Sequence, residues 1–246
     1  MKANSFTLVL DSSYMITDRV KHFVFHLSNQ KTLAYLPGQF ITLYFEHQGE
    51  KLHRSYSIAN PPNDDGRIEL AAGLVPQGVG SSFLNQLQVG DVIEAKGPFG
   101  RLTLKTPSPK RYIFIGTSTG ITPYRAMLDT LKDELEKKSL SIVLLQGVST
   151  RADCLYHDEF TAFAERYSNV SYYACLSREK EAHHHHEALG HVQDTLIKLQ
   201  LNASEDVIYL CGNPNMIDDT YQLLQDLNFS TPHIVREKYI SAPAKS

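Results

Sequence analysis

Cysteine is scarce in this chain, and its three residues lie far apart in the sequence. Cys154, Cys175 and Cys211 are too few and too scattered for a disulfide framework, which indicates a reducing compartment. Their spacing also does not match the C-x4-C-x2-C pattern of a plant-type iron–sulfur cluster. We therefore expect a cytoplasmic protein, and we expect any iron–sulfur partner to be a different chain.

Long apolar runs and an excess of basic charge are missing as well. No stretch approaches the roughly 20 apolar residues that span a bilayer, and residues 6–10 form too short a run for a signal peptide. The formal net charge of -3 excludes a generally basic nucleic-acid binder and argues against electrostatic membrane binding. With 246 residues, 42% of them hydrophobic, the chain suits one large or two ordinary soluble domains.

The first hundred residues are typical of short strands separated by turns. Several strands at this spacing predict a closed or nearly closed antiparallel barrel. Residues 97–100 (Gly-Pro-Phe-Gly) are expected to close this domain with a tight turn, and residues 106–110 to form a linker. The predicted strands are residues 6–10, 20–27, 40–45, 55–59, 68–74 and 92–95.

From residue 112 onward the pattern changes to alternating strands and helices. The strands are almost continuously apolar, as expected of a parallel sheet that is covered on both faces. Such a doubly wound sheet binds ligands beyond the carboxyl ends of its strands. The predicted strands are residues 112–115, 142–146, 170–176, 207–210 and 233–239, so we place one domain at 1–106 and a second at 107–246.

The tetrapeptide Arg54-Ser55-Tyr56-Ser57 suits a planar, phosphorylated, redox-active ligand such as a flavin. Alternation along a strand would place Arg54 and Tyr56 on one face and the two serines on the other. The Arg54 guanidinium could then bind a phosphate, Tyr56 could stack on the ring system, and Ser57 would lie near its reactive edge. The alternative is an exposed arginine beside an ordinary strand tyrosine.

Residues 77–84 look like a loop that leads into a short helix. Gly80, Ser81 and Ser82 lie at its start, where unpaired N–H groups and the positive end of the helix dipole suit a pyrophosphate. Together with Arg54 this would be a two-point contact to a dinucleotide. The alternative is a plain cap on a surface helix.

Two further loops follow predicted strands of the second domain. Gly116, Thr117 and Gly120 belong to a segment that ends in Thr122 and Pro123, where the glycines would allow a phosphate or ribose to approach the backbone. Here Thr122 could cap a helix. The second loop, Cys211-Gly212-Asn213-Pro214, lies where ligands of such sheets bind. A generic strand-to-helix turn and a buried, inert thiol are the alternatives.

In this order the motifs resemble those of the ferredoxin–NADP(+) reductase superfamily. Residues 54–57 match its R-x-Y-S flavin motif, and residues 78–84 look like its flavin-phosphate loop. Residues 116–123 match its G-T-G-T-G-I-A-P nucleotide loop except at Ser118 and Thr122. Residues 211–214 are similar to its C-G-x-P turn, and residues 35–40 to its P-G-Q-F strand entry. The resemblance covers nearly the whole chain and implies an FAD-binding barrel followed by an NAD(P)-binding domain.

The resemblance also implies roles for individual residues. Hydride would pass between nicotinamide C4 and flavin N5, with Ser57, Cys211 and Glu237 around the nicotinamide as catalytic residues. Tyr239 resembles the family's terminal aromatic residue that covers the flavin, although the chain continues to Ser246 and an ordinary core tyrosine is the alternative.

Coenzyme choice is expected to depend on the segment after the third strand of the second domain. There Ser177-Arg178 resembles the family's 2'-phosphate clasp, and Arg151 could be its partner. This favours NADP(H), although the Ser-Arg pair also occurs in relatives that use NADH.

We therefore expect an FAD-dependent oxidoreductase that exchanges hydride with NADP(H) and single electrons with a separate ferredoxin or flavodoxin. The alternatives are a reductase component of an oxygenase, a free-flavin reductase, or a non-catalytic nucleotide-binding regulatory module. His183 to His186 are expected to form a solvated, pH-responsive loop, with a metal site or an internal tag as alternatives. No resident metal is expected.

Overall fold

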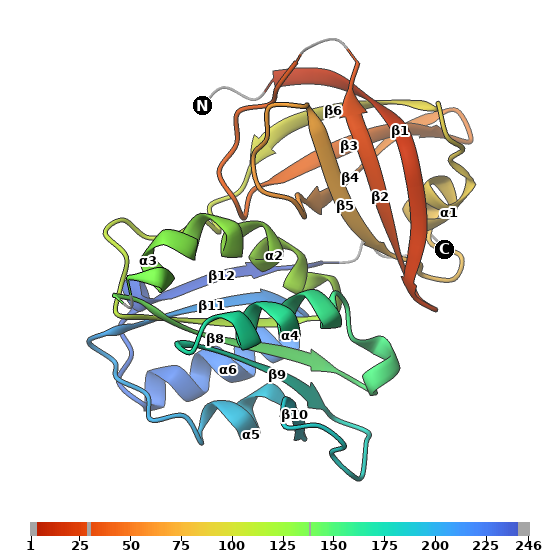
Figure 1. Cartoon of the computed structure of the whole chain (residues 1–246). Helices are drawn as coiled ribbons and strands as arrows, with labels where there is room; N and C mark the ends of the chain where they lie inside the picture. Colours follow the sequence, from red (N-terminus) through yellow and green to blue (C-terminus); the bar gives the residue numbers. More distant parts are fainter. Residues whose placement is uncertain (1–3, 29–30, 138, 241–246) are drawn as a thin grey trace. The chain divides into compact units, whose positions relative to one another are not determined.

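The computed structural model describes residues 4–28, 31–137 and 139–240 of the chain. These residues form two compact units. The first contains the chain up to Leu104 together with Thr122–Thr130, and the second contains Lys105–Ile121 and the chain from Leu131 onward. In these ranges, no helix has both the length and the apolar character needed to cross a membrane. Figure 1 shows both units and labels most of their helices and strands.

The first unit is built on a six-stranded sheet with the order β4-β3-β6-β1-β2-β5, in which all paired neighbours are antiparallel. Its elements are β1 (Asn4–Thr17), β2 (Val20–Leu27), β3 (Phe40–His47), β4 (Glu50–Ser57), β5 (Arg67–Gly73), α1 (Val79–Gln86), β6 (Val92–Phe99) and α2 (Thr122–Leu128).

The sheet of the first unit curls until its two outermost strands meet. Just beyond β4, Ile58 forms a β-bridge with Leu70 of β5, and the Ala59 N–H donates to the Glu69 carbonyl at 2.8 Å. Alternate side chains such as Phe23, Phe25 and Leu70 fill the interior. The predicted antiparallel barrel is therefore confirmed (Figure 1).

The second unit contains a six-stranded parallel sheet with the order β10-β9-β8-β7-β11-β12. Short 3-10 helices, Ser118–Ile121 and Arg151–Asp153, follow β7 and β8. The remaining elements are β7 (Arg111–Thr117), α3 (Lys132–Glu136), β8 (Ser141–Val148), α4 (His157–Arg166), β9 (Val170–Leu176), β10 (Glu187–Leu189), α5 (Val192–Leu196), β11 (Asp206–Gly212), α6 (Pro214–Asp226) and β12 (Ile234–Lys238).

Helices cover both faces of this sheet. Leu196 of α5 and Ile217 of α6 pack in one cluster with apolar residues of the central strands. On the other face, the Phe160 ring of α4 lies 5.6 Å from the Tyr172 ring of β9, between ring centroids. Burial on both sides explains why the central strands are almost entirely apolar, and the predicted doubly wound parallel sheet is confirmed (Figure 1).

Three local predictions differ from the structure. The strand predicted at residues 55–59 is β4, which begins at Glu50, because Gln48 and Gly49, both with positive φ, form a two-residue hairpin turn from β3. Residues 97–99 are part of β6 rather than a turn. Met127, Leu128, Leu131 and Leu135 have the spacing of one face of a single helix, but this stretch is divided into α2, a 3-10 turn and α3. The short β10 and α5 were not predicted.

Candidate functional site

In the first unit, β4 places Arg54 and Tyr56 on one side of the sheet. The antiparallel register sets Arg54 opposite Leu43 and Tyr56 opposite Ile41, two core residues of β3. Tyr56 is half-buried and packs against the barrel core. Burial raises the pKa of Tyr56 to about 12 against the opposing effect of the nearby Arg54 charge, so its hydroxyl stays protonated.

The start of α1 lies directly against these two side chains. A Cβ at Gly80 would be 2.8 Å from Cγ of Arg54 and 3.5 Å from the Tyr56 hydroxyl oxygen. Within the described chain, no side chain caps α1, so the N–H groups of its first turn are not bound by a cap. An arginine fork beside uncapped amides is a donor set that fits a pyrophosphate, and the aromatic ring suits a flat ligand.

The four serines predicted in the first unit have different environments. The Ser55 hydroxyl shares a 3.0 Å hydrogen bond with the Thr42 hydroxyl, and Ser57 is buried. Ser81 braces its own loop, because its hydroxyl accepts from the Val75 N–H at 3.0 Å and donates to the Gly73 carbonyl at 3.1 Å. A ligand phosphate would therefore meet the Ser81 N–H rather than its hydroxyl, whereas Ser82 is exposed.

In the second unit, two predicted loops meet at the point where the strand order reverses. From β7 the sheet continues through β8 in one direction and through β11 in the other, and Gly116 pairs with Cys211 across the β7–β11 boundary. A Cβ at Gly120 would collide with the Cys211 carbonyl oxygen. This reversal is the place where doubly wound sheets bind nucleotides.

Hydrogen bonding and backbone conformation also hold the loop after β7 against the loop after β11. Gly212 has a φ of +117°, and a Cβ there would lie 2.6 Å from the Thr117 hydroxyl oxygen. That oxygen accepts from the Asn213 N–H at 2.9 Å. The Asn213 side chain in turn caps α6, with Oδ1 accepting from the Asn215 N–H at 2.8 Å. Only small residues can occupy this junction, which leaves backbone groups open to a ligand.

Cys211 and Glu237 are paired residues on the neighbouring strands β11 and β12. Burial raises the pKa of the fully buried Cys211 thiol far above its usual range, so it is a neutral thiol rather than a thiolate. Burial also raises the pKa of Glu237, to about 7. The Tyr239 N–H donates to the Gly212 carbonyl at 2.8 Å, which places the backbone of Tyr239 at the same edge of the sheet.

Thr122 and Pro123 are the first two residues of α2 and belong to the first unit. The Thr122 hydroxyl is buried and has no hydrogen-bond partner among residues 4–28, 31–137 and 139–240. It therefore does not cap the helix, contrary to our expectation. A buried hydroxyl without a partner is costly, so a bound ligand at this position would stabilise it.

The residues predicted for coenzyme choice lie after β8 and β9. Arg178 is exposed and forms no ion pair with any described residue. Arg151 is different, because its Nε lies 2.9 Å from Oε1 of Glu187 and its Nη1 lies 3.1 Å from Oε2 of Glu179. The hydrogen bond from Arg151 outweighs desolvation and holds the pKa of Glu187 at about 2. Arg151 would have to leave both glutamates to bind a phosphate. The Ser177 hydroxyl donates to the Val148 carbonyl at 3.2 Å.

The histidine loop is only partly solvated. His183, His184 and His185 are exposed, but His186 is half-buried, and its ring lies 4.7 Å from the His157 ring between centroids. Both ring nitrogens of His186 are buried without a hydrogen-bond partner in the described part of the chain. The described residues contain no group of three or more His, Cys, Asp or Glu side chains arranged to hold a metal ion.

Sequence reasoning missed Glu187, which contacts the predicted residue Arg151, and Arg125, which lies just after the predicted nucleotide loop. Glu187 follows the histidine run in a polar stretch without periodicity, so its contact with Arg151, 36 residues away, had no local signal. Arg125 follows the predicted nucleotide loop, at the third position after Thr122, and its proximity to that motif was the available signal.

Comparison with known proteins agrees with this geometry. Residues 7–104 match the family model described as an oxidoreductase FAD-binding domain, and residues 114–222 match an oxidoreductase NAD-binding domain. The anthranilate 1,2-dioxygenase electron transfer component of Acinetobacter baylyi is 32% identical over 86% of this chain and 60% of its own length. A ferredoxin–NADP reductase B from Sorangium cellulosum is 29% identical over 89% of this chain and 91% of its own.

A solved structure has the same fold. The ferredoxin–NADP(+) reductase of Neisseria gonorrhoeae, with bound FAD and NADP, has a TM-score of 0.81 and 22% identity, covering 97% of this chain and 99% of that chain. Fold and sequence together define an oxidoreductase with an FAD-binding barrel and a pyridine-nucleotide-binding sheet. The chain belongs to the ferredoxin–NADP(+) reductase superfamily of flavoproteins. It spans about 60% of the length of the dioxygenase components that it matches.

Proposed function

We propose that this protein is an FAD-dependent oxidoreductase that exchanges hydride with NADP(H) and single electrons with a separate carrier such as ferredoxin or flavodoxin. Residues 1–106 would bind FAD and residues 107–246 the pyridine nucleotide. The observation that carries the proposal is that each unit holds a preassembled half-site. In the barrel the start of α1 lies against Arg54 and Tyr56, and in the parallel sheet the Gly116–Gly120 loop packs on Cys211–Gly212.

Each residue in these half-sites has a physical role in the proposal. Arg54 and the first turn of α1 would hold the FAD phosphates, and Tyr56 would orient the isoalloxazine by stacking. When bound, FAD supplies the chemistry, because it accepts a hydride, that is, two electrons and a proton, and can release its electrons singly. Ser57 and the neutral Cys211 thiol would belong to the nicotinamide site. Because Cys211 is fully buried, the residues that cover it would have to move before its thiol contacts the nicotinamide. Glu237, whose pKa of about 7 lies near neutrality, could hold or release a proton there.

We propose NADP(H) as the coenzyme on the strength of Arg178. Its exposed guanidinium can meet a 2'-phosphate through a planar fork of donors. Ser177 would contribute through the same loop. Arg151 would contribute only by leaving Glu179 and Glu187, so it ranks behind Arg178.

An absorption spectrum of the purified protein tests the proposal. Flavin bands should be present, they should bleach anaerobically with NADPH faster than with NADH, and they should recover when oxidised ferredoxin or flavodoxin is added. A coloured protein that neither nucleotide bleaches would contradict a reductase function. A colourless protein whose added FAD is not bleached would instead support a non-catalytic nucleotide-binding module.

A reductase component of an oxygenase is the second candidate. It is favoured by the 32% and 31% identity to dioxygenase electron transfer components, of whose length the chain spans about 60%. In this case the reduced protein should pass electrons to an oxygenase-type iron–sulfur protein faster than to a stand-alone ferredoxin or flavodoxin. Loss of FAD during gel filtration, together with turnover of added flavin, would indicate a free-flavin reductase.

We also propose a cytoplasmic location. The support is that all three cysteines are free and buried, which is usual in a reducing compartment. Fractionation of the native host with a tagged copy of the chain would test it.

A further inference from the structure

The helix α2 joins two parts of the molecule that the proposed function needs. The Gly116–Ile121 loop belongs to the second unit, and one peptide bond later the chain enters the first unit at Thr122. The chain remains there through Thr130 before it returns. The chain therefore passes from the candidate nucleotide loop directly into α2, a helix of the first unit.

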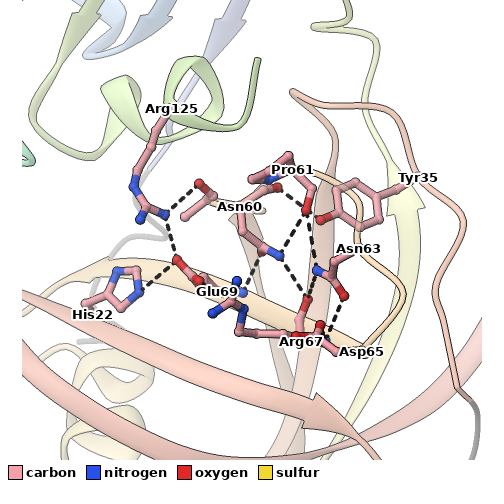
Figure 2. A network of polar contacts seen from close by, with 10 residues as sticks. His22, Tyr35, Asn60, Pro61, Asn63, Asp65, Arg67, Glu69 and Arg125 are labelled. Carbon is pink, nitrogen blue, oxygen red and sulfur yellow. Dashed lines mark hydrogen bonds and ion pairs between the residues drawn. The ribbon is translucent and has the colours of Figure 1, made fainter. Parts of the chain in front are cut away.

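Arg125 of α2 provides that attachment. Its Nη1 donates to Oε2 of Glu69 at 2.6 Å and to the carbonyl oxygen of Ala59 at 3.0 Å. Figure 2 shows the guanidinium pointing toward Glu69. Ala59 lies two residues after Ser57, so the second bond ties α2 to the segment that continues the candidate flavin strand.

Glu69 is in an unusual position for a carboxylate. Its strand neighbours Ile68 and Leu70 face the barrel core, so Glu69 is on the outward face of β5, yet only 6% of it is exposed. Val24 of β2 is its paired residue, which makes His22, two positions away, a diagonal neighbour on the same face. A buried carboxylate on an outward face requires partners to compensate its desolvation.

The partners of Glu69 supply that compensation. The His22 Nε2 lies 3.4 Å from Oε2, the Arg67 Nε lies 3.3 Å from Oε1, and Arg125 adds the shortest contact. Desolvation alone would raise the pKa of Glu69, but hydrogen bonds from His22 and Arg125 hold it at about 2. Glu69 is therefore a fixed anion for Arg125 throughout the neutral pH range.

The Ala59 side of the contact is equally fixed. Asn60, the next residue, accepts the Glu69 N–H at 2.8 Å and donates to the Arg67 carbonyl at 2.9 Å. The Tyr35 hydroxyl donates to the Asn60 carbonyl at 3.0 Å (Figure 2). Arg125 thus contacts a braced segment rather than a free loop.

We propose that Arg125 is a positioning residue for hydride transfer, which holds α2, and with it the end of the nucleotide loop, to Glu69 and to the segment that follows Ser57. The inference rests on the proposed reductase function. An arginine suits this role because one planar group serves a carboxylate and a carbonyl together, which a lysine ammonium does with less geometric constraint.

Stopped-flow measurement of FAD reduction by saturating NADPH tests the inference. Arg125→Gln should lower the limiting rate about tenfold or more, while the concentration of NADPH at half-saturation changes less than about threefold, because the helix is displaced but the nucleotide contacts are kept. Arg125→Lys should recover part of the rate. Glu69→Gln should also lower the limiting rate, but by less than Arg125→Gln, because Arg125 keeps its bond to the Ala59 carbonyl. The double variant should be no slower than Arg125→Gln, because Arg125→Gln already removes the interaction with Glu69.

Arg111→Gln is the matched control. The Arg111 and Asp206 side chains, 22% and 3% exposed, form a similarly buried ion pair in the second unit, against 20% and 8% for Arg125 and Glu69. Arg111 is at the start of β7, six residues along the chain from Thr117. Its loss should lower the melting temperature without slowing FAD reduction.

The outcomes separate this inference from the proposed function. If the wild-type protein holds FAD that neither NADPH nor NADH reduces, the proposed function fails. If the wild type is reduced but Arg125→Gln is reduced at the rate of Arg111→Gln, only the role of Arg125 is overturned. If Arg125→Gln does not retain FAD, the rates of FAD reduction in Arg125→Lys and Glu69→Gln test the role of Arg125 instead. Wild-type rates in both of these variants would overturn that role.

Discussion

The two units present their candidate ligand-binding groups in different ways. The barrel presents side chains, because Arg54 and Tyr56 project from β4 toward the start of α1. The parallel sheet presents backbone, because Gly116, Gly120 and Gly212 remove side chains from the junction of two loops. The first arrangement depends on residue chemistry and the second on the close approach of main chains, so the two half-sites should respond differently to the same kind of substitution.

The sharpest form of this comparison is a glycine-to-alanine substitution in each half-site. A Cβ at Gly120 would collide with a backbone carbonyl, whereas a Cβ at Gly80 would meet the flexible Cγ of Arg54 at 2.8 Å. We expect Gly120→Ala to reduce the NADPH-dependent rate of flavin reduction about 100-fold, because packed backbones relax poorly. We expect Gly80→Ala to weaken FAD binding by less than about tenfold.

Gly73→Ala serves as the control, since its Cβ would meet no described atom within 4 Å. Rates and FAD affinity should be measured on all three variants by stopped-flow and fluorescence titration. A Gly80→Ala variant as impaired as Gly120→Ala would show that both half-sites depend on backbone approach, and the distinction between them would fail.

Arg54 tests the side-chain half of the comparison. Charge-assisted hydrogen bonds to phosphate contribute about 1.5–3 kcal/mol, so Arg54→Ala should weaken FAD binding roughly 10- to 100-fold. The FAD affinity of Arg54→Lys should lie between those of the wild type and Arg54→Ala, because lysine keeps the charge and loses the planar set of donors. The exposed Arg101 of the same unit gives the control Arg101→Ala. Unchanged FAD affinity in Arg54→Ala would remove Arg54 from the site.

Sequence was a good guide where local pattern determines the structure. Strands Val20–Leu27 and Val170–Leu176 coincide with the predicted residues, because burial set their apolar pattern. It failed at the polar residues Glu50 to His53, where a hairpin turn and strand pairing decide the structure. A residue's distant partners also leave no local trace, and for this reason neither the glutamates around Arg151 nor the contact of Arg125 with Glu69 could be predicted.

Coenzyme choice tests the comparison within the second unit, because this property is expected to depend on a side chain rather than on the backbone. Arg178→Ala should weaken the binding of NADPH about tenfold and leave the binding of NADH unchanged, because one charged contact to the 2'-phosphate is lost. Arg151→Ala should change the preference less, since Arg151 is paired with Glu179 and Glu187. Steady-state kcat/KM with both coenzymes would measure this. A larger loss of preference in Arg151→Ala would show that Arg151 leaves its glutamates to bind the phosphate.

The smallest expected effect concerns Glu237, which is paired with Cys211 on the neighbouring strand. Burial raises its pKa from the usual 4.5 to about 7, so the folded state keeps a proton that the unfolded chain releases. The free energy of unfolding should therefore decrease as pH rises from about 4.5 to about 7, by about 1–2 kcal/mol after allowance for partial exposure.

Glu237→Gln cannot titrate and should lose this pH dependence. Glu165→Gln, which removes an exposed carboxyl of α4, should keep it. Urea denaturation at pH 5 and pH 8 measures the difference. Equal slopes in wild type and Glu237→Gln would mean that Glu237 titrates as a solvated carboxylate, and the proton-holding role proposed for it would be withdrawn.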